Sequence, residues 1–198
     1  LKGANLKEFR ENVQMIFQNP YASLNPKMKI RDILSEPLII NRKLSKSEID
    51  KILKLKIQQV GLSDKHLEFY PHEFSGGQRQ RIAIARALVL SPEFVIADEP
   101  VSALDASIQA QIINLIKDLK TEYQMTMMFI SHDLNVIRYI ADRVGIMYLG
   151  ELVEIGTRDE IFNSPQHPYT KLLLDSIPNI NKKPDSVNLS ELPLELPK

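Results

Sequence analysis

One stretch constrains the fold of this chain more than any other, and it runs from Ser75 to Asp105. It reads SGGQRQRIAIARALVLSPEFVIADEPVSALD. A serine and two glycines precede a helical run of apolar residues, and a short apolar segment then ends in two adjacent carboxylates. A buried helix followed by a buried strand is typical of an α/β domain with a parallel sheet.

The start of this helix suits a phosphate group. Ser75 is a favourable N-cap residue, and Gly76 and Gly77 leave the first amide groups of the helix unobstructed. A helix amino terminus offers free N–H donors and the positive end of the helix dipole. We therefore expect an anion-binding turn at this position.

The segment after the helix delivers acidic side chains. Phe94–Ala97 is apolar without alternation and lies between Pro92 and Pro100, which predicts a parallel strand covered on both faces. Asp98 and Glu99 then fall at its carboxyl end, where open α/β sheets bind their ligands. One carboxylate can serve a magnesium ion through its water shell, and the other can polarise an attacking water.

Together these motifs resemble those of a known family. SGGQ followed by RQRIAIARAL, an apolar strand ending in DE, and SALD are similar to the signature motif, Walker B strand and D-loop of an ABC-type ATPase. Their order is specific, whereas each motif alone would suggest only a glycine turn or a surface loop. The resemblance, from about Val13 to Pro178, implies an α/β fold. The resemblance further implies a partial P-loop NTPase core with a parallel sheet plus an α-helical subdomain, and ATP and Mg²⁺ as cofactors.

The chain is expected to divide into four segments. These are a core strand and Q-loop (1–26), an α-helical subdomain ending in the signature helix (27–90), a core with Walker B, D-loop and switch histidine (91–157), and a carboxyl-terminal extension and tail (158–198). The residue pattern further predicts strands at 13–17 and 125–130. It also predicts a β-hairpin of 143–149 and 152–155 around Gly150-Glu151.

The resemblance gives four side chains roles in catalysis. Gln18, at the end of the first predicted strand, would contact the magnesium ion and the attacking water, and Asp98 would position the metal with it. Glu99 would act as general base or orient the water, and His132 would contact the terminal phosphate as the switch histidine. Taken alone, Gln18 fits a solvated surface turn better than a functional site. A lone histidine is usually structural, but the position of His132 just past a second predicted strand favours a functional role.

Other residues would serve a nucleotide bound to a partner subunit. The resemblance places Ser75, Gly76, Gly77 and Gln78 over the ATP on the P-loop of the other subunit. The loop at Asp105 would cross to that subunit and couple the two sites. A plainer interpretation of Asp105 is an N-cap for the following helix, and the two are compatible.

Two further stretches point to a transport branch of the family. QNPYASLNP and HPYTKLLLDSIP resemble the Q-loop and the carboxyl-terminal extension of oligopeptide and dipeptide importers, which share these motifs with nickel importers. This implies a second ABC ATPase subunit (identical or sister), integral membrane permease subunits and, indirectly, a solute-binding protein. The subunit would lie peripherally on the cytoplasmic face of a prokaryotic cell membrane. The alternatives are a soluble ABC ATPase and a non-catalytic remnant that only complements a partner.

Composition excludes several other classes. The net charge of +0 gives no indication of a nucleic-acid partner, and the lack of cysteine excludes disulfides and thiolate metal sites. No apolar run is long enough to span a bilayer, so a membrane role would depend on a partner. The length of 198 residues allows one α/β domain with a satellite.

The sequence departs from the family pattern in one respect. None of its seven glycines begins a G-x-x-x-x-G-K-[ST] phosphate-binding loop, and residue 1 is leucine. We therefore expect the carboxyl-terminal portion of a longer ATPase subunit, inactive by itself. We expect the final segment, from Asn179, to form a mobile or loosely docked tail.

Overall fold

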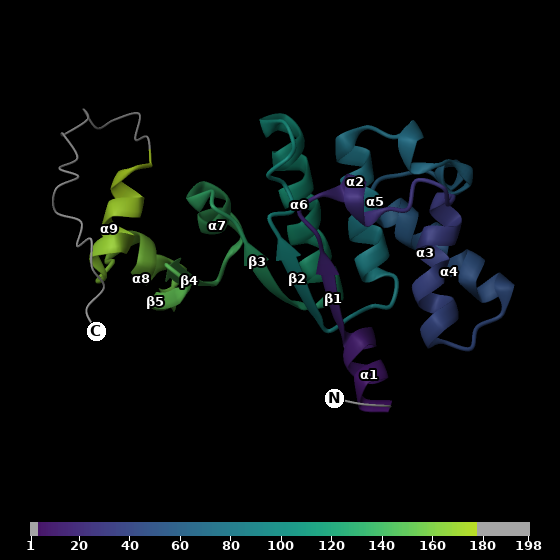
Figure 1. The fold of residues 1–198 in the computed structure, drawn as a ribbon, viewed down its shortest axis with the longest axis horizontal. Coiled ribbons are helices and arrows are strands. Elements are labelled where there is room, and N and C mark those ends of the chain that lie inside the picture. Colours follow the sequence, from purple (N-terminus) through teal and green to yellow (C-terminus); the bar gives the residue numbers. More distant parts are fainter. Residues whose placement is uncertain (1–3, 178–198) are drawn as a thin grey trace. The chain divides into compact units, whose positions relative to one another are not determined.

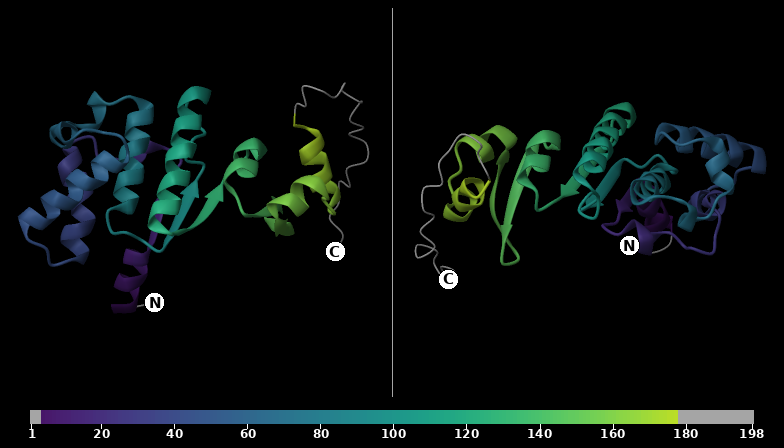
Figure 2. Two further views of the ribbon diagram at one scale, coloured as in Figure 1. Left: turned by 180° about the vertical axis from the view of Figure 1, so that it is seen from behind. Right: turned by 90° about the horizontal axis from the view of Figure 1, so that it is seen from above.

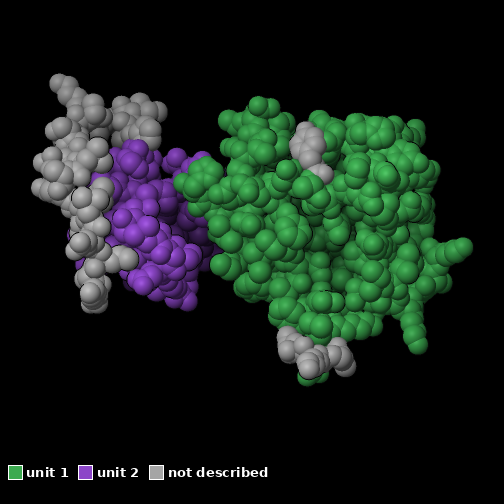
Figure 3. Space-filling view, in the orientation of Figure 1, with its two compact units in different colours: residues 1–132 green, residues 133–198 purple. Residues whose placement is uncertain are grey.

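The computed structural model of this chain describes residues 4–177. The chain divides into two compact units, residues 1–132 and 133–198, which Figure 3 shows in different colours. The tail predicted from Asn179 lies outside the described residues. Among the residues described, no helix is long and apolar enough to cross a membrane.

Unit 1 is built on a parallel sheet of three strands (Figure 1). The strands are β1 (Val13–Ile16), β2 (Phe94–Asp98) and β3 (Thr126–Ile130), in the order β1-β2-β3. Both pairings are parallel, with Met15 beside Ile96 and Ile96 beside Met128. The predicted parallel sheet is confirmed, and the carboxyl ends of all three strands meet at one edge.

Helices make up the rest of unit 1. They are α1 (Ala4–Asn12), α2 (Pro20–Ser23), α3 (Ile30–Asn41), α4 (Lys46–Gln59), η1 (Asp64–Glu68), η2 (Pro71–Glu73), α5 (Gly76–Leu88) and α6 (Ala106–Tyr123). Helices α3 and α4 lie to one side of the three strands, with α5 between them and the sheet (Figure 2). Their apolar residues form a continuous core that includes Leu34, Leu53 and Ile84.

The sheet is covered on one face only by the described helices. Val95 and Ala97, on alternate positions of β2, are fully buried, and α5 and α6 lie on one side of the sheet (Figure 2). On the other face Met15 is 36% exposed and Met128 is 51% exposed, while Ile96 between them is half-buried. The expectation that β2 is covered on both faces is therefore wrong for the described part of the chain, because α5 and α6 lie on the same side.

A buried lysine joins α4 to α6. Lys56 is only 5% exposed, and its ammonium group donates to the Tyr123 hydroxyl at 2.7 Å and to the Ser91 hydroxyl at 3.3 Å. The same nitrogen lies 4.1 Å from the centre of the Tyr123 ring, a cation–π contact. Burial lowers the pKa of Lys56 to about 8.

Unit 2 contains the predicted hairpin. Its elements are α7 (Leu134–Ile140), β4 (Arg143–Tyr148), β5 (Glu151–Thr157), α8 (Arg158–Asn163) and α9 (Pro168–Asp175). The turn lies at Leu149-Gly150, one residue earlier than predicted, since these two residues have positive φ angles of 48° and 87°. A two-residue turn of this kind matches the twist of the flanking strands.

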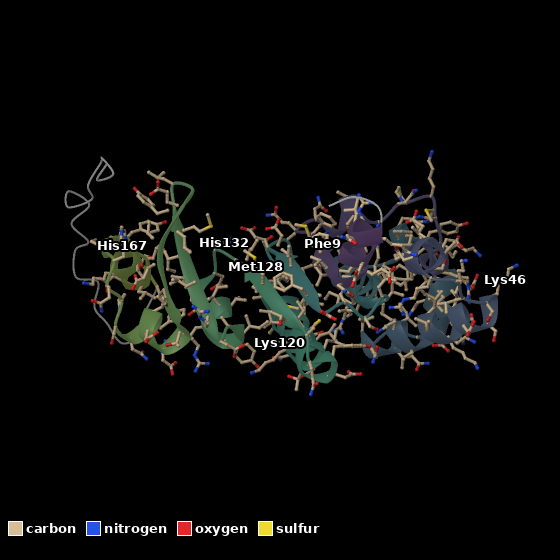
Figure 4. The ribbon with its side chains drawn as sticks, turned by 90° about the horizontal axis from the view of Figure 1, so that it is seen from below. Phe9, Lys46, Lys120, Met128, His132 and His167 are labelled. Carbon is tan, nitrogen blue, oxygen red and sulfur yellow. The ribbon has the colours of Figure 1, made fainter. Side chains whose placement is uncertain are left out.

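The segment after α8 is fastened to β5. The carboxylate of Glu154 accepts hydrogen bonds from the backbone N–H of Gln166 at 2.8 Å and of His167 at 3.1 Å. The His167 side chain, labelled in Figure 4, in turn accepts from the Tyr169 N–H and caps α9. One side chain on the hairpin thus fixes where α9 begins.

Candidate functional site

The carboxyl edge of the sheet of unit 1 carries the predicted acidic pair. Asp98 is the last residue of β2, and Glu99 follows it with a positive φ of 42°. The backbone N–H of Glu99 donates to the Ile130 carbonyl at 3.0 Å, so Glu99 is tied to the end of β3. Both carboxylates are half-buried at the edge where open α/β sheets bind ligands.

Two side chains from the neighbouring strands converge on Glu99. Gln18 follows β1 by two residues, and its amide nitrogen donates to Glu99 Oε2 at 2.6 Å. His132, labelled in Figure 4, follows β3 by two residues, and its Nδ1 lies 3.1 Å from Glu99 Oε1. Parallel pairing explains this cluster, because residues just past three adjacent strand ends meet at the same edge.

The surroundings of Glu99 favour its ionised form. Hydrogen bonding with His132, followed by its charge and by hydrogen bonds from Ser102 and Gln18, lowers the pKa of Glu99. The Glu99 side chain is 25% exposed and the His132 side chain 72% exposed. The cluster therefore presents an oriented, accessible carboxylate, as a base for a water molecule requires.

The donor set at this edge fits a magnesium ion that retains water. Asp98 offers a carboxylate. Gln18 donates to Glu99 through its amide nitrogen, so its amide oxygen is not used in that hydrogen bond. Within residues 4–177 no cluster of three or more His, Cys, Asp or Glu side chains could hold a metal on its own. Magnesium suits such a site, since it is commonly bound by one or two protein oxygens together with phosphates and waters.

The predicted phosphate-binding turn begins α5. Ser75 Oγ accepts from the Gln78 N–H at 3.4 Å, and Gln78 Oε1 accepts from the Ser75 N–H at 3.0 Å, which together form a capping box. This arrangement leaves the Ser75 hydroxyl proton free to be donated. Gly76 and Gly77 supply the first N–H groups of the helix, which have no intrahelical acceptor.

Helix α6 makes a glycine necessary in this turn. A Cβ atom on Gly77 would lie 2.6 Å from the Ile108 Cγ2 methyl group. The close approach of α5 and α6 therefore depends on the absence of a side chain at Gly77. A second pair of residues also joins these helices, because Arg81 donates to Gln111 Oε1 at 3.3 Å.

Asp105 occupies the N-cap position of α6 but does not cap it with its side chain. No capping hydrogen bond is made by the carboxylate, which lies on an exposed residue. The predicted N-cap position of Asp105 is therefore confirmed, but its carboxylate makes no capping hydrogen bond and remains available to another group.

The predicted site residues form two separate sets. Gln18, Glu99 and His132 are joined by hydrogen bonds at the sheet edge, next to Asp98. The turn at 75–78 makes its side-chain hydrogen bonds internally, and no hydrogen bond within residues 4–177 joins it to Glu99. One set surrounds the end of β2, whereas the other surrounds the start of α5.

The sequence analysis named the SALD motif but gave its first residue, Ser102, no role of its own at the sheet edge. The Ser102 hydroxyl donates to the backbone carbonyl of Glu99 at 3.1 Å. Pro100 followed two residues later by serine is a turn signal that could have indicated this contact, since Pro is favoured at the second position of a β-turn.

Comparison with family sequence profiles identifies two regions of the chain. The family described as ABC transporter matches residues 1–102, just over half of the chain. The family described as oligopeptide/dipeptide transporter, C-terminal region, matches residues 153–198.

Curated relatives are identical to this chain at about half of the aligned positions. It is 54% identical over 181 residues to the dipeptide transport ATP-binding protein DppF of Lactococcus lactis subsp. cremoris (strain MG1363), which covers 90% of this chain and 58% of the relative. It is also 54% identical to the oligopeptide transport ATP-binding protein OppF of Streptococcus mutans serotype c, covering 94% of this chain and 60% of the relative. The chain thus spans less than two thirds of the length of these relatives.

Solved structures with the same fold are ABC proteins. A dimeric ATP-binding cassette in a post-hydrolysis state, bound to ADP and Pi, has a TM-score of 0.68 at 30% identity, covering 80% of this chain and 68% of that one. The cbiO1 protein of Clostridium perfringens, part of the ABC transporter complex cbiONQ, has a TM-score of 0.72 at 27% identity, covering 82% of this chain and 64% of that one.

Proposed function

Because this chain belongs to the ABC transporter family, we propose that it is part of the ATP-hydrolysing subunit of a peptide importer. The convergence of Gln18 and His132 on Glu99, at 2.6 and 3.1 Å, carries this proposal. ATP hydrolysis requires a water molecule held in line with the terminal phosphate, and a fixed carboxylate at a sheet edge suits that task.

In the proposed reaction the four side chains at the sheet edge act on one nucleotide. Glu99 accepts a hydrogen bond from the attacking water and takes up its proton, while Gln18 and His132 fix the carboxylate in place. His132 is also exposed enough to reach the terminal phosphate. Asp98 and the amide oxygen of Gln18 would hold Mg²⁺, which would neutralise charge on the phosphate oxygens.

The turn at the start of α5 acts on a second nucleotide, bound to another ATPase subunit. Ser75 donates its hydroxyl, and the N–H groups of Gly76 and Gly77 face the terminal phosphate. Gln78 holds the turn through the capping box. The Asp105 carboxylate, which makes no capping hydrogen bond, approaches the partner's site. That a dimeric cassette is among the similar structures supports this arrangement.

The transported solute and the remaining partners follow from the relatives. Those named above are described as dipeptide and oligopeptide transport proteins, and residues 153–198 match the C-terminal region of such transporters. We infer that the subunit works on short peptides with a second ATPase subunit, membrane permease subunits and, through them, a solute-binding protein. It would then act at the cytoplasmic face of the membrane.

Substitution of Glu99 tests the proposal. In the full-length subunit we expect Glu99→Gln to abolish ATP turnover but retain nucleotide-driven dimerisation, because the amide cannot accept the proton yet has the same shape. Turnover by phosphate release and dimerisation by size-exclusion chromatography are the measurements.

A matched control lies at the other end of the same strand. Glu93 precedes β2 and is exposed, so Glu93→Gln should leave turnover unchanged. Near-normal hydrolysis by the Glu99→Gln subunit would overturn the role of Glu99, and no hydrolysis by the unaltered subunit would overturn the proposed function.

A second candidate function rests on the turn at the start of α5. Its side-chain hydrogen bonds are internal, and no hydrogen bond within residues 4–177 joins it to Glu99, so a polypeptide could complete a partner's site through this turn without catalysis of its own. Peptide uptake by cells that lack the gene, and its restoration by the unaltered but not the Glu99→Gln subunit, separates the two candidates. A non-catalytic protein would restore uptake equally well with either residue.

A further inference from the structure

We propose that Ser102 is a positioning residue for the ATPase reaction: its hydroxyl holds the backbone of Glu99 in the conformation that aims the carboxylate. This inference rests on the proposed function and adds to it a residue that does not touch the nucleotide. It is carried by the backbone geometry of residues 99–102.

The backbone of Glu99 adopts a conformation that is unfavourable for residues with a side chain. Its φ of 42° lies in the left-handed region, which residues other than glycine adopt uncommonly. Such a conformation persists only where surrounding contacts hold it, and it is found preferentially at functional sites. The contacts that hold Glu99 are therefore candidates for a role in the reaction.

Ser102 makes two of these contacts, and both reach the carbonyl oxygen of Glu99. Its hydroxyl donates to the Glu99 carbonyl at 3.1 Å, and its backbone N–H donates to that carbonyl at 3.3 Å. The second bond closes a β-turn from Glu99 to Ser102 with Pro100 at its second position, where proline is favoured. The hydroxyl adds a bond that the turn alone does not provide.

The other contacts fix the turn from outside. The Glu99 N–H donates to the Ile130 carbonyl, which ties the start of the turn to β3. Within the turn, Val101 is 4% exposed and its carbonyl accepts from the side chain of Gln109 on α6 at 2.9 Å. With both flanks anchored in this way, the Ser102 hydroxyl is the side-chain contact that acts on the Glu99 carbonyl, beside the backbone N–H of the turn.

A small backbone rotation at Glu99 would disperse the cluster. The carboxylate is held between the Gln18 amide at 2.6 Å and the His132 ring at 3.1 Å. Since these partners follow the ends of different strands, β1 and β3, a carboxylate displaced by about 1 Å cannot keep both, and misplacement of that size can cost about 100-fold in rate. Binding of nucleotide does not depend on this carboxylate, so the loss should fall on kcat.

The experiment compares Ser102→Ala with Ser102→Thr in the full-length subunit. We expect Ser102→Ala to lower kcat for ATP hydrolysis about 10-fold or more while KM changes by less than about 2-fold. Ser102→Thr keeps the hydroxyl and should retain most of the activity. Ser47→Ala, at an exposed position of α4, is the matched control and should behave like the unaltered subunit.

Each outcome bears on one statement. Unchanged kcat in Ser102→Ala, in a subunit that hydrolyses ATP, would overturn the inference and leave the proposed function intact. Equal losses in the Ala and Thr variants, or loss of nucleotide-driven dimerisation in either, would also overturn it, because packing rather than the hydroxyl would be responsible. A subunit inactive with Ser102 unaltered would overturn the proposed function itself.

Discussion

At the scale of single residues, Lys56 has the most unusual environment in unit 1. Its ammonium group is buried against Ser91 and Tyr123, and no carboxylate within residues 4–177 forms an ion pair with it. Glu122 and Arg42 are the charged groups that act on it from nearby, with opposite effects on its pKa. Burial is the dominant effect, and it disfavours the charged form.

This burial predicts how stability depends on pH. The pKa of Lys56 is about 8 in the folded chain, against an ordinary value of 10.5. Between these values the unfolded chain binds more protons, so the free energy of unfolding rises with pH. We expect the unaltered chain to gain about 2 kcal/mol relative to Lys56→Met between about pH 7.5 and 9.5, measured by urea unfolding.

The neighbouring Lys54 provides the control. It is exposed on the same helix, and its hydrogen bond to Asp50 raises its pKa. Lys54→Met should therefore show no such relative gain across this pH range. A constant difference between the unaltered chain and Lys56→Met would contradict the buried, depressed pKa.

Sequence reasoning reached some of these residues and not others. Asp98, Glu99 and His132 follow apolar runs that end in polar residues, and such strand ends can be read directly. Lys56 could not be identified, because α4 carries four lysines and periodicity does not distinguish a buried one from an exposed one. Ser102 was noticed only as part of the SALD motif, because its contact with Glu99 depends on a backbone angle that no residue pattern encodes.

At the scale of elements, the contact between α5 and α6 sets the position of the turn at residues 75–78. Gly77 and Ile108 approach so closely that a β-carbon has no space, and Arg81 with Gln111 forms a second contact one turn further along. The glycine therefore has a packing role in addition to exposing its N–H group. The two roles can be separated by substitution.

We expect Gly77→Ala to destabilise the chain by about 1–3 kcal/mol, because the added methyl group overlaps the Ile108 side chain. In an Ile108→Ala background the same substitution should cost clearly less. Urea unfolding of the four members of this double-mutant cycle measures the coupling. Additive effects would show that the contact is not the cause.

The elements were predicted more accurately than their ends. The alternating apolar pattern identified the hairpin, but its turn was placed one residue too late. Gly150 was recognised as a turn residue, whereas the positive φ of Leu149 before it was not, since leucine rarely adopts that conformation. The strand register then follows from the turn, with Tyr148 opposite Glu151.

At the scale of the whole molecule, the bare face of the sheet is the main departure from expectation. Parallel sheets usually have helices on both faces. Here Met15 and Met128 are exposed on the face opposite to Val95, and the described residues provide no helix over them. The apolar run of β2 predicted burial on both faces, and this holds for one face only. An apolar strand does not reveal which helices of the described chain cover it.

We expect the 198-residue chain to show no saturable binding of Mg-ATP up to about millimolar concentrations in titration calorimetry. Its groups at the sheet edge can orient a nucleotide, but no G-x-x-x-x-G-K-[ST] loop is present to cradle the phosphates. The full-length subunit serves as the positive control. Micromolar binding by the 198-residue chain would contradict this expectation.

The two hydrogen bonds that the Gln166 and His167 amides donate to the Glu154 carboxylate have a consequence for protein engineering. The loop before α9 looks like a natural junction for chimaeras, yet a junction there would take the carboxylate from one parent and the amides from the other. The match to the transporter C-terminal region begins at residue 153, one position before Glu154, so it contains both halves of the bond. A crossover at 152/153 would therefore transfer the region together with its own anchor, as an exchangeable module.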